Sequence, residues 1–221
     1  MKILTMVSHC KNNSSDQILC PIIKGLNSAQ SDCAIIIPSG NANRLLLTAL
    51  ATKKNRANCQ VAILCNDPFI DRDSFFLELY SLGVRTISNW PSSIFLEQSF
   101  KKAMSNIGIH PDSEFEYLAQ ASSAGLRPQA FIRSLDQGRQ AIKKGIKDII
   151  IHPGLNQALT QKAHNAVLDS LQLMIEAFLN IDPTLSIYIY QHSQKDLNAY
   201  RERYPEKTSP ISGYVIYGSV E

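Results

Sequence analysis

The chain has 221 residues, of which 44% are hydrophobic, so it can bury a substantial core. Its formal net charge is only +3 and its basic residues are dispersed, which argues against a nucleic-acid-binding surface. No apolar run approaches the ~20 residues that span a bilayer, and no signal peptide is evident. The five cysteines include no CxxC pair and are expected to be reduced thiols. These features predict a soluble cytoplasmic protein whose partners include neither nucleic acid nor membrane.

Eight short apolar runs recur along the chain, and each is expected to form a strand. The runs are residues 2–8, 33–37, 61–65, 86–89, 129–132, 148–151, 186–190 and 211–217. Helical spacing of apolar residues occurs between most of them. The expected helices are residues 18–26, 45–50, 74–82, 94–104, 113–124, 135–144, 157–179 and 195–204, so that the fourth strand is followed by two helices.

Alternating strands and helices predict an α/β fold, a single (β/α)8 TIM barrel over residues 1–221 with short loops. The chain ends soon after the last predicted strand, so we expect the C-terminal eighth helix to be absent. That absence would leave part of the barrel wall bare. We expect either a second subunit, in a homo-oligomer, or the long helix over residues 157–179 to cover it.

Barrels of this kind carry their chemistry at the C-terminal ends of their strands. Polar residues that could bind or react stand just after nearly every predicted strand. They are His9, Ser39, Asn66, Asp67, Asn89, Arg133, His152, His192, Ser219 and Glu221.

Three of these residues are histidines, which could meet around a metal or act as general acid and base. No HxH or HExxH spacing supports a metal motif. His9 alone is better explained as an ordinary loop residue. His152 lies in a His-Pro-Gly-Leu segment directly after an all-aliphatic strand, which favours a role in a site. His192 falls between these two cases.

The charged candidates each have two explanations. Asp67 could bind a metal, a hydroxyl or a carbonyl, or it could be a turn residue before Pro68. Arg133 is suited to a carboxylate or phosphate, and a surface salt bridge explains it equally well. Glu114 opens a predicted helix, where the macrodipole favours negative charge.

Two uncharged residues are also of interest. Gly154 could let a ligand approach the backbone, whereas Cys65 is better explained as a buried strand thiol than as a nucleophile.

Several segments, in one order along the chain, resemble the phosphoenolpyruvate hydrolase-like family, whose members are also described as TIM-barrel signal transduction proteins. The segments are Asn66-Asp67-Pro68-Phe69, Ser88-Asn89-Trp90-Pro91, Asp112-Ser113-Glu114-Phe115-Glu116 and Asp148-Ile149-Ile150-Ile151-His152-Pro153-Gly154-Leu155. The resemblance covers residues 61–155 well and is thinner on both sides.

Three loops depart from the family pattern. The family has a glycine-rich G-G-G-A-G-T-G after its first strand, where this chain has Ser8-His9-Cys10-Lys11-Asn12. The arginine-bearing segment after the second strand is missing, and no G-G-P follows His192. Elements expected to bind anions are therefore absent. Either the substrate differs from that of typical members, or the activity has been lost.

The resemblance implies an enzyme of the phosphoenolpyruvate/pyruvate type that acts on a small oxo-acid or its enol or phosphorylated form. Hydrolysis or C–C or P–C bond chemistry would be the reaction, which makes the protein a hydrolase or a lyase. Its ligand would be a small carboxylate.

Candidate roles can be assigned by position. His152, Asp67 and His192 are the catalytic candidates. The substrate-binding candidates are Asn66, Asn89, Arg133, Gly154, Ser219, Glu221, Glu114 and Ser39. No metal ligand set can be named, although a divalent metal such as magnesium is compatible with these residues. The alternative is a non-catalytic barrel that binds a small molecule or a protein partner in a signalling or scaffold role.

Overall fold

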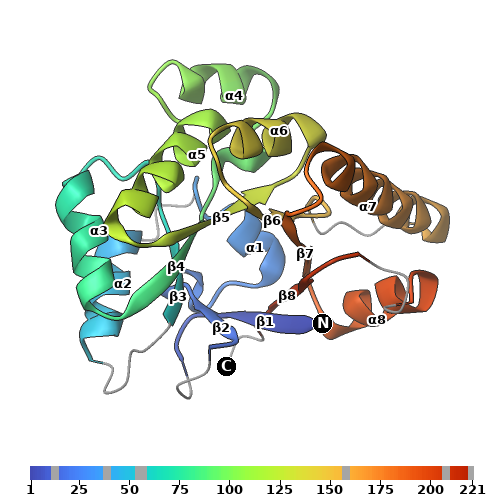
Figure 1. Ribbon diagram of the computed structural model, residues 1–221, viewed down its shortest axis with the longest axis horizontal. Coiled ribbons are helices and arrows are strands. Elements are labelled where there is room, and N and C mark those ends of the chain that lie inside the picture. The colour runs from blue at the N-terminus through green and yellow to red at the C-terminus, as the bar shows by residue number, and fades with distance from the viewer. Residues whose placement is uncertain (11–14, 37–40, 53–58, 156–159, 206–209, 219–221) are drawn as a thin grey trace.

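The computed structural model describes residues 1–10, 15–36, 41–52, 59–155, 160–205 and 210–218. Its strands are all parallel and pair in chain order to close a barrel, which confirms the predicted (β/α)8 fold (Figure 1). The strands are β1 (Lys2–Val7), β2 (Gln17–Leu19), β3 (Cys59–Ile63), β4 (Val84–Asn89), β5 (Arg127–Ile132), β6 (Asp148–Ile151), β7 (Ser186–Gln191) and β8 (Gly213–Tyr217). Pairing of β1 with β8 completes the ring.

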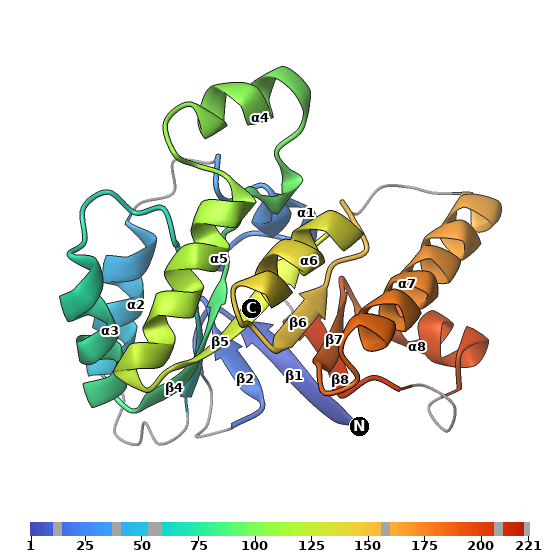
Figure 2. The ribbon, with the colours of Figure 1, turned by 45° about the horizontal axis from the view of Figure 1, so that its top comes forward.

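Helices surround most of the barrel. They are α1 (Ser28–Asp32), α2 (Ala42–Ala51), α3 (Arg72–Ser81), α4 (Gln98–Ser105), α5 (Pro111–Gln120), α6 (Leu135–Lys143), α7 (Gln161–Ile181) and α8 (Gln194–Arg203), with short 3₁₀ turns at Pro21–Ile23, Ser93–Phe95 and Ala121–Ala124. Two helices follow β4, as predicted. The first of them, α4, stands away from the barrel in Figure 2 and buries none of its residues.

The second strand was predicted in the wrong place. It is β2, whereas residues 33–36 form turns after α1 and Ile36 is half exposed. The apolar spacing over residues 18–26 suggested a helix. Pro21 prevents a helix through this segment, because proline has no N–H to donate and its ring clashes with the preceding turn. The backbone instead stays extended through Cys20, whose N–H donates to the Val7 carbonyl.

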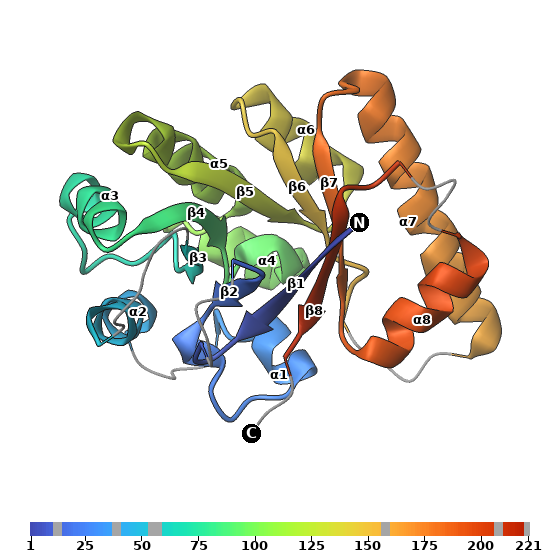
Figure 3. The ribbon, with the colours of Figure 1, turned by 60° about the horizontal axis from the view of Figure 1, so that its bottom comes forward.

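The long helix, one of the two expected covers for the bare part of the wall, does not lie there. Helix α7 follows β6 and packs against α6. Figure 3 shows β1, β2 and β8 facing the viewer; α8 packs against β8, and no helix of the described part of the chain is drawn in front of β1. Ile3 of β1 is 37% exposed. A covering subunit in a homo-oligomer stays a prediction.

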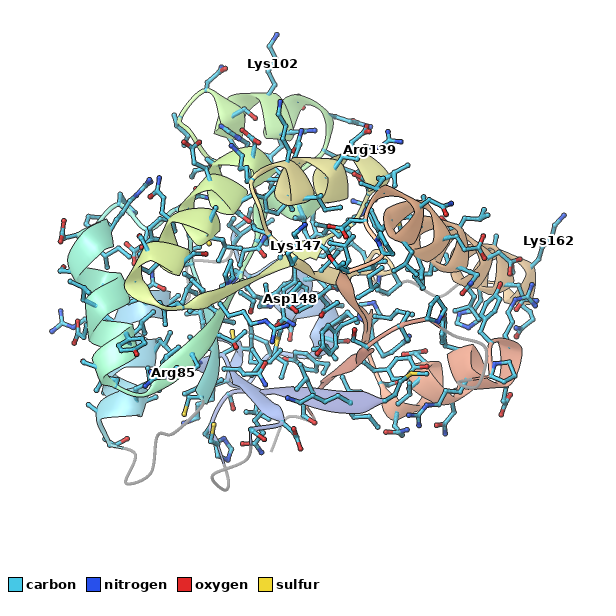
Figure 4. The ribbon with its side chains drawn as sticks, viewed as in Figure 1. Arg85, Lys102, Arg139, Lys147, Asp148 and Lys162 are labelled. Atoms are coloured by element: carbon cyan, nitrogen blue, oxygen red, sulfur yellow. The ribbon has the colours of Figure 1, made fainter. Side chains whose placement is uncertain are left out.

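The charged surface agrees with the dispersed sequence charge. Figure 4 shows Lys102, Arg139 and Lys162 on three different helices, at the outer edge of the molecule. Asp148, near the centre of that view, begins β6 and accepts hydrogen bonds from Nε and Nη2 of Arg127, which begins β5. None of the helices described is both long and apolar enough to cross a bilayer.

Candidate active site

A short helix lies across the C-terminal mouth of the barrel. Asn27 begins α1 as a capping box, in which its side chain accepts from the Gln30 N–H and its own N–H donates to the Gln30 side chain. Trp90 Nε1, after β4, donates to Ser31 Oγ (3.0 Å). The Tyr217 hydroxyl, at the end of β8, donates to the Leu26 carbonyl (2.8 Å). These contacts with two strand ends place Asp32, the last residue of α1, over the mouth.

Aromatic rings fill the centre of the mouth. The Trp90, His152 and Tyr190 rings stack on one another, with centroids 4.4–5.8 Å apart, and all three residues are at most 1% exposed. Phe95 meets the His152 ring edge-on at 4.7 Å. A ligand therefore cannot occupy the centre of the mouth without displacing these side chains.

Asp32, at the end of α1, and His152, after β6, form a fully buried pair. His152 Nε2 lies 3.2 Å from Asp32 Oδ1, and His152 Nδ1 accepts from the Gly154 N–H (3.1 Å). Because Nδ1 accepts, the ring proton is on Nε2, and Nε2 donates to the aspartate. Burial lowers the pKa of His152 well below its usual value, and the Arg133 charge lowers it further. His152 is therefore neutral at physiological pH.

His192 joins this pair from the end of β7. Its Nε2 donates to the Gly154 carbonyl (3.0 Å), and its Nδ1 lies 3.8 Å from Asp32 Oδ2. Nδ1 has no hydrogen-bond partner among the described residues. Burial and the neighbouring His152 lower the pKa of His192, and Asp32 opposes this change. Protonation of Nδ1 would place an N–H opposite the aspartate, which is how a carboxylate orients a catalytic histidine.

The three side chains are a poor magnesium site. One donor atom from each of Asp32, His152 and His192 lies within 4.8 Å of the others. Two imidazoles and one carboxylate suit zinc better than magnesium, which prefers oxygen ligands. However, the His152 hydrogen bonds place a proton on the nitrogen that faces Asp32. Acid–base chemistry fits this arrangement better than metal binding.

A cavity of about 610 Å³ opens beside the filled mouth, between α7 and α8 and the ends of β5, β6 and β7. Its wall includes Arg133, Gly154 and His192, three residues that the sequence singled out. Gln191, only 2% exposed, also lines it, and the Gln191 Nε2 has no hydrogen-bond partner in the described part of the chain. Arg133 pairs with Glu97, which lies in the same wall.

A second group of predicted residues meets around Glu114, away from the cavity. Glu114 is completely buried at the start of α5. Its carboxylate accepts from Asn66 Nδ2 (3.1 Å), Asn89 Nδ2 (2.9 Å), Ser92 Oγ (2.6 Å) and the Ser93 N–H (2.7 Å). Burial raises the pKa of Glu114, and the hydrogen bonds from Asn89, Ser92 and Ser93 oppose this rise. The cluster joins the end of β4 to α5.

Asp67 lies in a separate buried contact at the end of β3. It accepts from Asn43 Nδ2 (3.1 Å) of α2 and from the Phe69 N–H (2.9 Å), and it is 6% exposed. The turn explanation accounts for the Phe69 contact, and the Asn43 contact joins this turn to α2. His9 is exposed beside Ser8. Ser39, Ser219 and Glu221 lie outside the described residues.

A family model matches most of the chain. It is described as phosphoenolpyruvate hydrolase-like and aligns with residues 25–190. The chain belongs to the phosphoenolpyruvate hydrolase-like family. This match agrees with the resemblance drawn from the segments around Asn66, Glu114 and His152.

Individual proteins also resemble this phosphoenolpyruvate hydrolase-like chain, at 10–24% identity. The uncharacterized protein y4oT of Sinorhizobium fredii is 24% identical over 162 residues, which are 71% of this chain and 82% of y4oT. The tomato (Solanum lycopersicum) ToMV susceptible protein tm-1(GCR26) is 24% identical over 71% of this chain, but only 22% of the tomato protein is covered. The crystal structure of a putative phosphonomutase from Burkholderia cenocepacia superposes with a TM-score of 0.51 at 10% identity, covering 97% of this chain and 85% of the other. That likeness supports the barrel fold.

Sequence reasoning missed Asp32 and Gln191. Asp32 was overlooked because the residues after it were expected to form a strand, which would have placed Asp32 at the opposite end of the barrel. The capping-box residues Asn27 and Gln30 were the signal for a helix ending near Asp32. Gln191 was hidden inside the end of β7, where a polar residue that faces a cavity looks like any other strand residue.

The two buried histidines are expected to make the protein lose stability in mild acid. Both have lowered pKa values in the folded state, so the unfolded chain binds up to two more protons once the pH falls below about 6.5. The free energy of unfolding should therefore fall between about pH 7 and 5, by up to ~1.4 kcal/mol per pH unit for each proton. Urea unfolding across this range measures the slope. His192→Gln should reduce this slope by the contribution of up to one proton, whereas replacement of the exposed His9 by glutamine should leave the slope unchanged. Equal slopes in the wild type and both variants would refute the assignment.

Proposed function

We propose that this protein is an enzyme that acts on a small oxo-acid, or its enol or phosphorylated form, bound in the cavity beside the barrel mouth. The observation that carries the proposal is the cavity wall around Gln191. There the Arg133 guanidinium can donate to ligand oxygens, and His192 lies next to it. Gln191 Nε2 is buried behind this wall without a partner among the described residues, so a small shift of its side chain would bring it to the ligand. Arg133 already pairs with Glu97, so a ligand carboxylate would compete with that glutamate.

Arrangement of the helices also favours an anionic ligand. Helices α7 and α8 follow β6 and β7, so both begin at the mouth end of the barrel. Gln161 of α7 and Lys195 of α8 line the cavity within the first turns of these helices. The Glu97 and Asp196 carboxylates in the same wall balance the Arg133 and Lys195 charges, so the positive ends of the two helix dipoles are what tip the cavity toward an anion.

His192 is the proposed acid–base group, and Asp32 is the residue that positions it. In the folded protein Nε2 carries the proton and faces Gly154, which itself lines the cavity. A bound substrate could replace the Gly154 carbonyl as the hydrogen-bond acceptor of Nε2–H. When the ring gains a second proton on Nδ1, the nearby Asp32 carboxylate stabilises the imidazolium.

One proton transfer is common to the reactions expected of such a substrate. When a C–C or P–C bond to the carbon next to the oxo group breaks, the electron pair of that bond stays on an enolate, and the other fragment leaves as a carbonyl compound or as a phosphoryl group taken up by water. Hydrolysis of an enol phosphate releases phosphate and an enol. Each product becomes the stable oxo-acid only when its carbon gains a proton. In the proposal the His192 imidazolium donates its Nε2 proton to that carbon and is left as a neutral ring whose remaining proton is on Nδ1, beside Asp32. The reverse transfer returns the ring to the imidazolium.

The test is exchange of the methyl protons of pyruvate for deuterium in D₂O, followed by ¹H NMR. The wild-type protein is expected to accelerate this exchange, because exchange requires reversible formation of the enolate. His192→Asn should slow the catalysed exchange by at least about 100-fold, as is usual when a general acid–base group is removed. Asp32→Asn should slow it as well and shift its pH profile, whereas pyruvate binding should persist in both variants.

His9→Asn is the matched control, because His9 is an exposed histidine outside the cavity. Exchange in this variant should equal that of the wild type. If pyruvate binds and neither pyruvate nor longer 2-oxo acids exchange, the enzyme proposal is wrong and a non-catalytic binding role remains. If calorimetry detects no binding of any of these acids, both roles are rejected.

The filled barrel mouth favours the non-catalytic role, in which the protein binds a small molecule without transforming it. Trp90, His152 and Tyr190 occupy the centre of the barrel end, where substrates of TIM-barrel enzymes usually react. A small-molecule sensor would need the cavity but not an open mouth. The exchange experiment separates the two roles.

A further inference from the structure

The cavity has two chemically different halves. Its polar half lies at the strand ends and the first turns of α7 and α8, and includes two cations, Arg133 and Lys195, two carboxylates, Glu97 and Asp196, and the side chains of Gln191 and His192. One to three turns further along these helices the wall is apolar, formed by Val167, Leu168, Leu171 and Ala199. Since both helices run away from the mouth, the apolar half lies deeper between them.

The volume exceeds what a three-carbon acid needs. About 610 Å³ is the volume of roughly twenty water molecules at ~30 Å³ each. Pyruvate would fill only part of this space and would leave the slot between Leu168, Leu171 and Ala199 unused. Water in that slot would gain few hydrogen bonds from the apolar walls, so an apolar ligand group would displace it favourably.

We infer that the preferred ligand is a 2-oxo acid with an unbranched apolar tail, its carboxylate at Arg133 and Gln191 and its tail between α7 and α8. This inference rests on the proposed function, since it names the substrate class of the same cavity. The carboxylate lies beside His192 in this orientation, which keeps the carbon next to the oxo group near the proposed proton donor. The tail follows the two helices toward Leu171 and Ala199.

Calorimetric titration with pyruvate, 2-oxobutanoate, 2-oxohexanoate and 2-oxooctanoate tests the inference. Each added methylene that enters the slot should tighten binding roughly fourfold. Ala199→Leu fills the slot and should abolish this gain for the long acids while leaving pyruvate affinity unchanged. Asn198→Leu places the same leucine on the exposed side of the same helix, outside the slot, and should keep the gain.

The outcomes separate this inference from the proposed function. Affinity that does not rise with chain length overturns the inference, and so does an Ala199→Leu variant that retains the full gain. Pyruvate exchange that persists in either case leaves the enzyme proposal intact. A chain-length gain without deuterium exchange in any of these acids supports the ligand class and rejects the enzyme. Octanoate binding as tightly as 2-oxooctanoate would show that the oxo group is not recognised and would overturn the inference.

Discussion

Replacing Glu114 by alanine is expected to lower the free energy of unfolding by about 3–5 kcal/mol. The carboxylate is completely buried, and it is the acceptor for Asn66, Asn89, Ser92 and the Ser93 N–H. Its removal leaves these donors buried beside a small cavity. Each buried donor without an acceptor costs about 1–3 kcal/mol. The melting temperature should fall by roughly 10 °C or more for a chain of this size.

Glu116 provides the matched control on the same helix. Its side chain is 63% exposed and lies 3.7 Å from Lys144, a surface ion pair expected to contribute less than about 1 kcal/mol. Glu116→Ala should therefore change the melting temperature by only a few degrees. Urea unfolding of both variants measures the difference. Equal losses would show that the Glu114 cluster does not stabilise the fold.

Replacing Gly213 by alanine is expected to cost about 3 kcal/mol, because it damages the seam where the barrel closes. Gly213 pairs with Lys2 across β8 and β1. A Cβ at this position would lie 2.1 Å from the Lys2 carbonyl oxygen and 2.9 Å from the Lys2 carbonyl carbon. Both atoms belong to the backbone, so no side-chain rotation relieves the clash. The first and last strands must separate locally.

Two comparisons make this prediction specific. Ser212→Ala changes the neighbouring residue without adding an atom at the seam, and its effect on thermal unfolding should be small. Lys2→Ala should fail to rescue Gly213→Ala, since the clash involves the Lys2 backbone. Rescue by Lys2→Ala, or a melting temperature equal to that of the wild type, would contradict the structural explanation.

Most strands could be placed from the sequence because they are buried on both faces. Residues 149–151 are an unbroken apolar run after Asp148, and such runs are typical of parallel strands covered by helices. β2 could not be found in this way. It has only three residues, too few to show a strand pattern in the sequence. Its extended conformation depends on hydrogen bonding to β1 on one side and β3 on the other.

The sequence correctly placed polar candidate residues at the strand ends, but it did not predict which groups their side chains contact. Asn66 and Asn89 follow β3 and β4, as expected, but they turn toward Glu114 rather than toward the cavity. Their amide groups satisfy a buried carboxylate that lies 25–48 residues away in sequence. Nothing in the local pattern reveals that direction, because it depends on where α5 packs.

The sequence by itself determined the alternating α/β pattern, the two helices after β4, and the placement of His152 and His192 after β6 and β7. These features follow from local chemistry: apolar runs, caps and glycines act within a few residues. The tertiary structure alone decided that α1 brings Asp32 to both histidines and that the barrel centre is filled by Trp90 and Tyr190. It also placed the cavity between α7 and α8. Such features arise when distant segments share one buried volume, and packing in that volume is set by the whole chain.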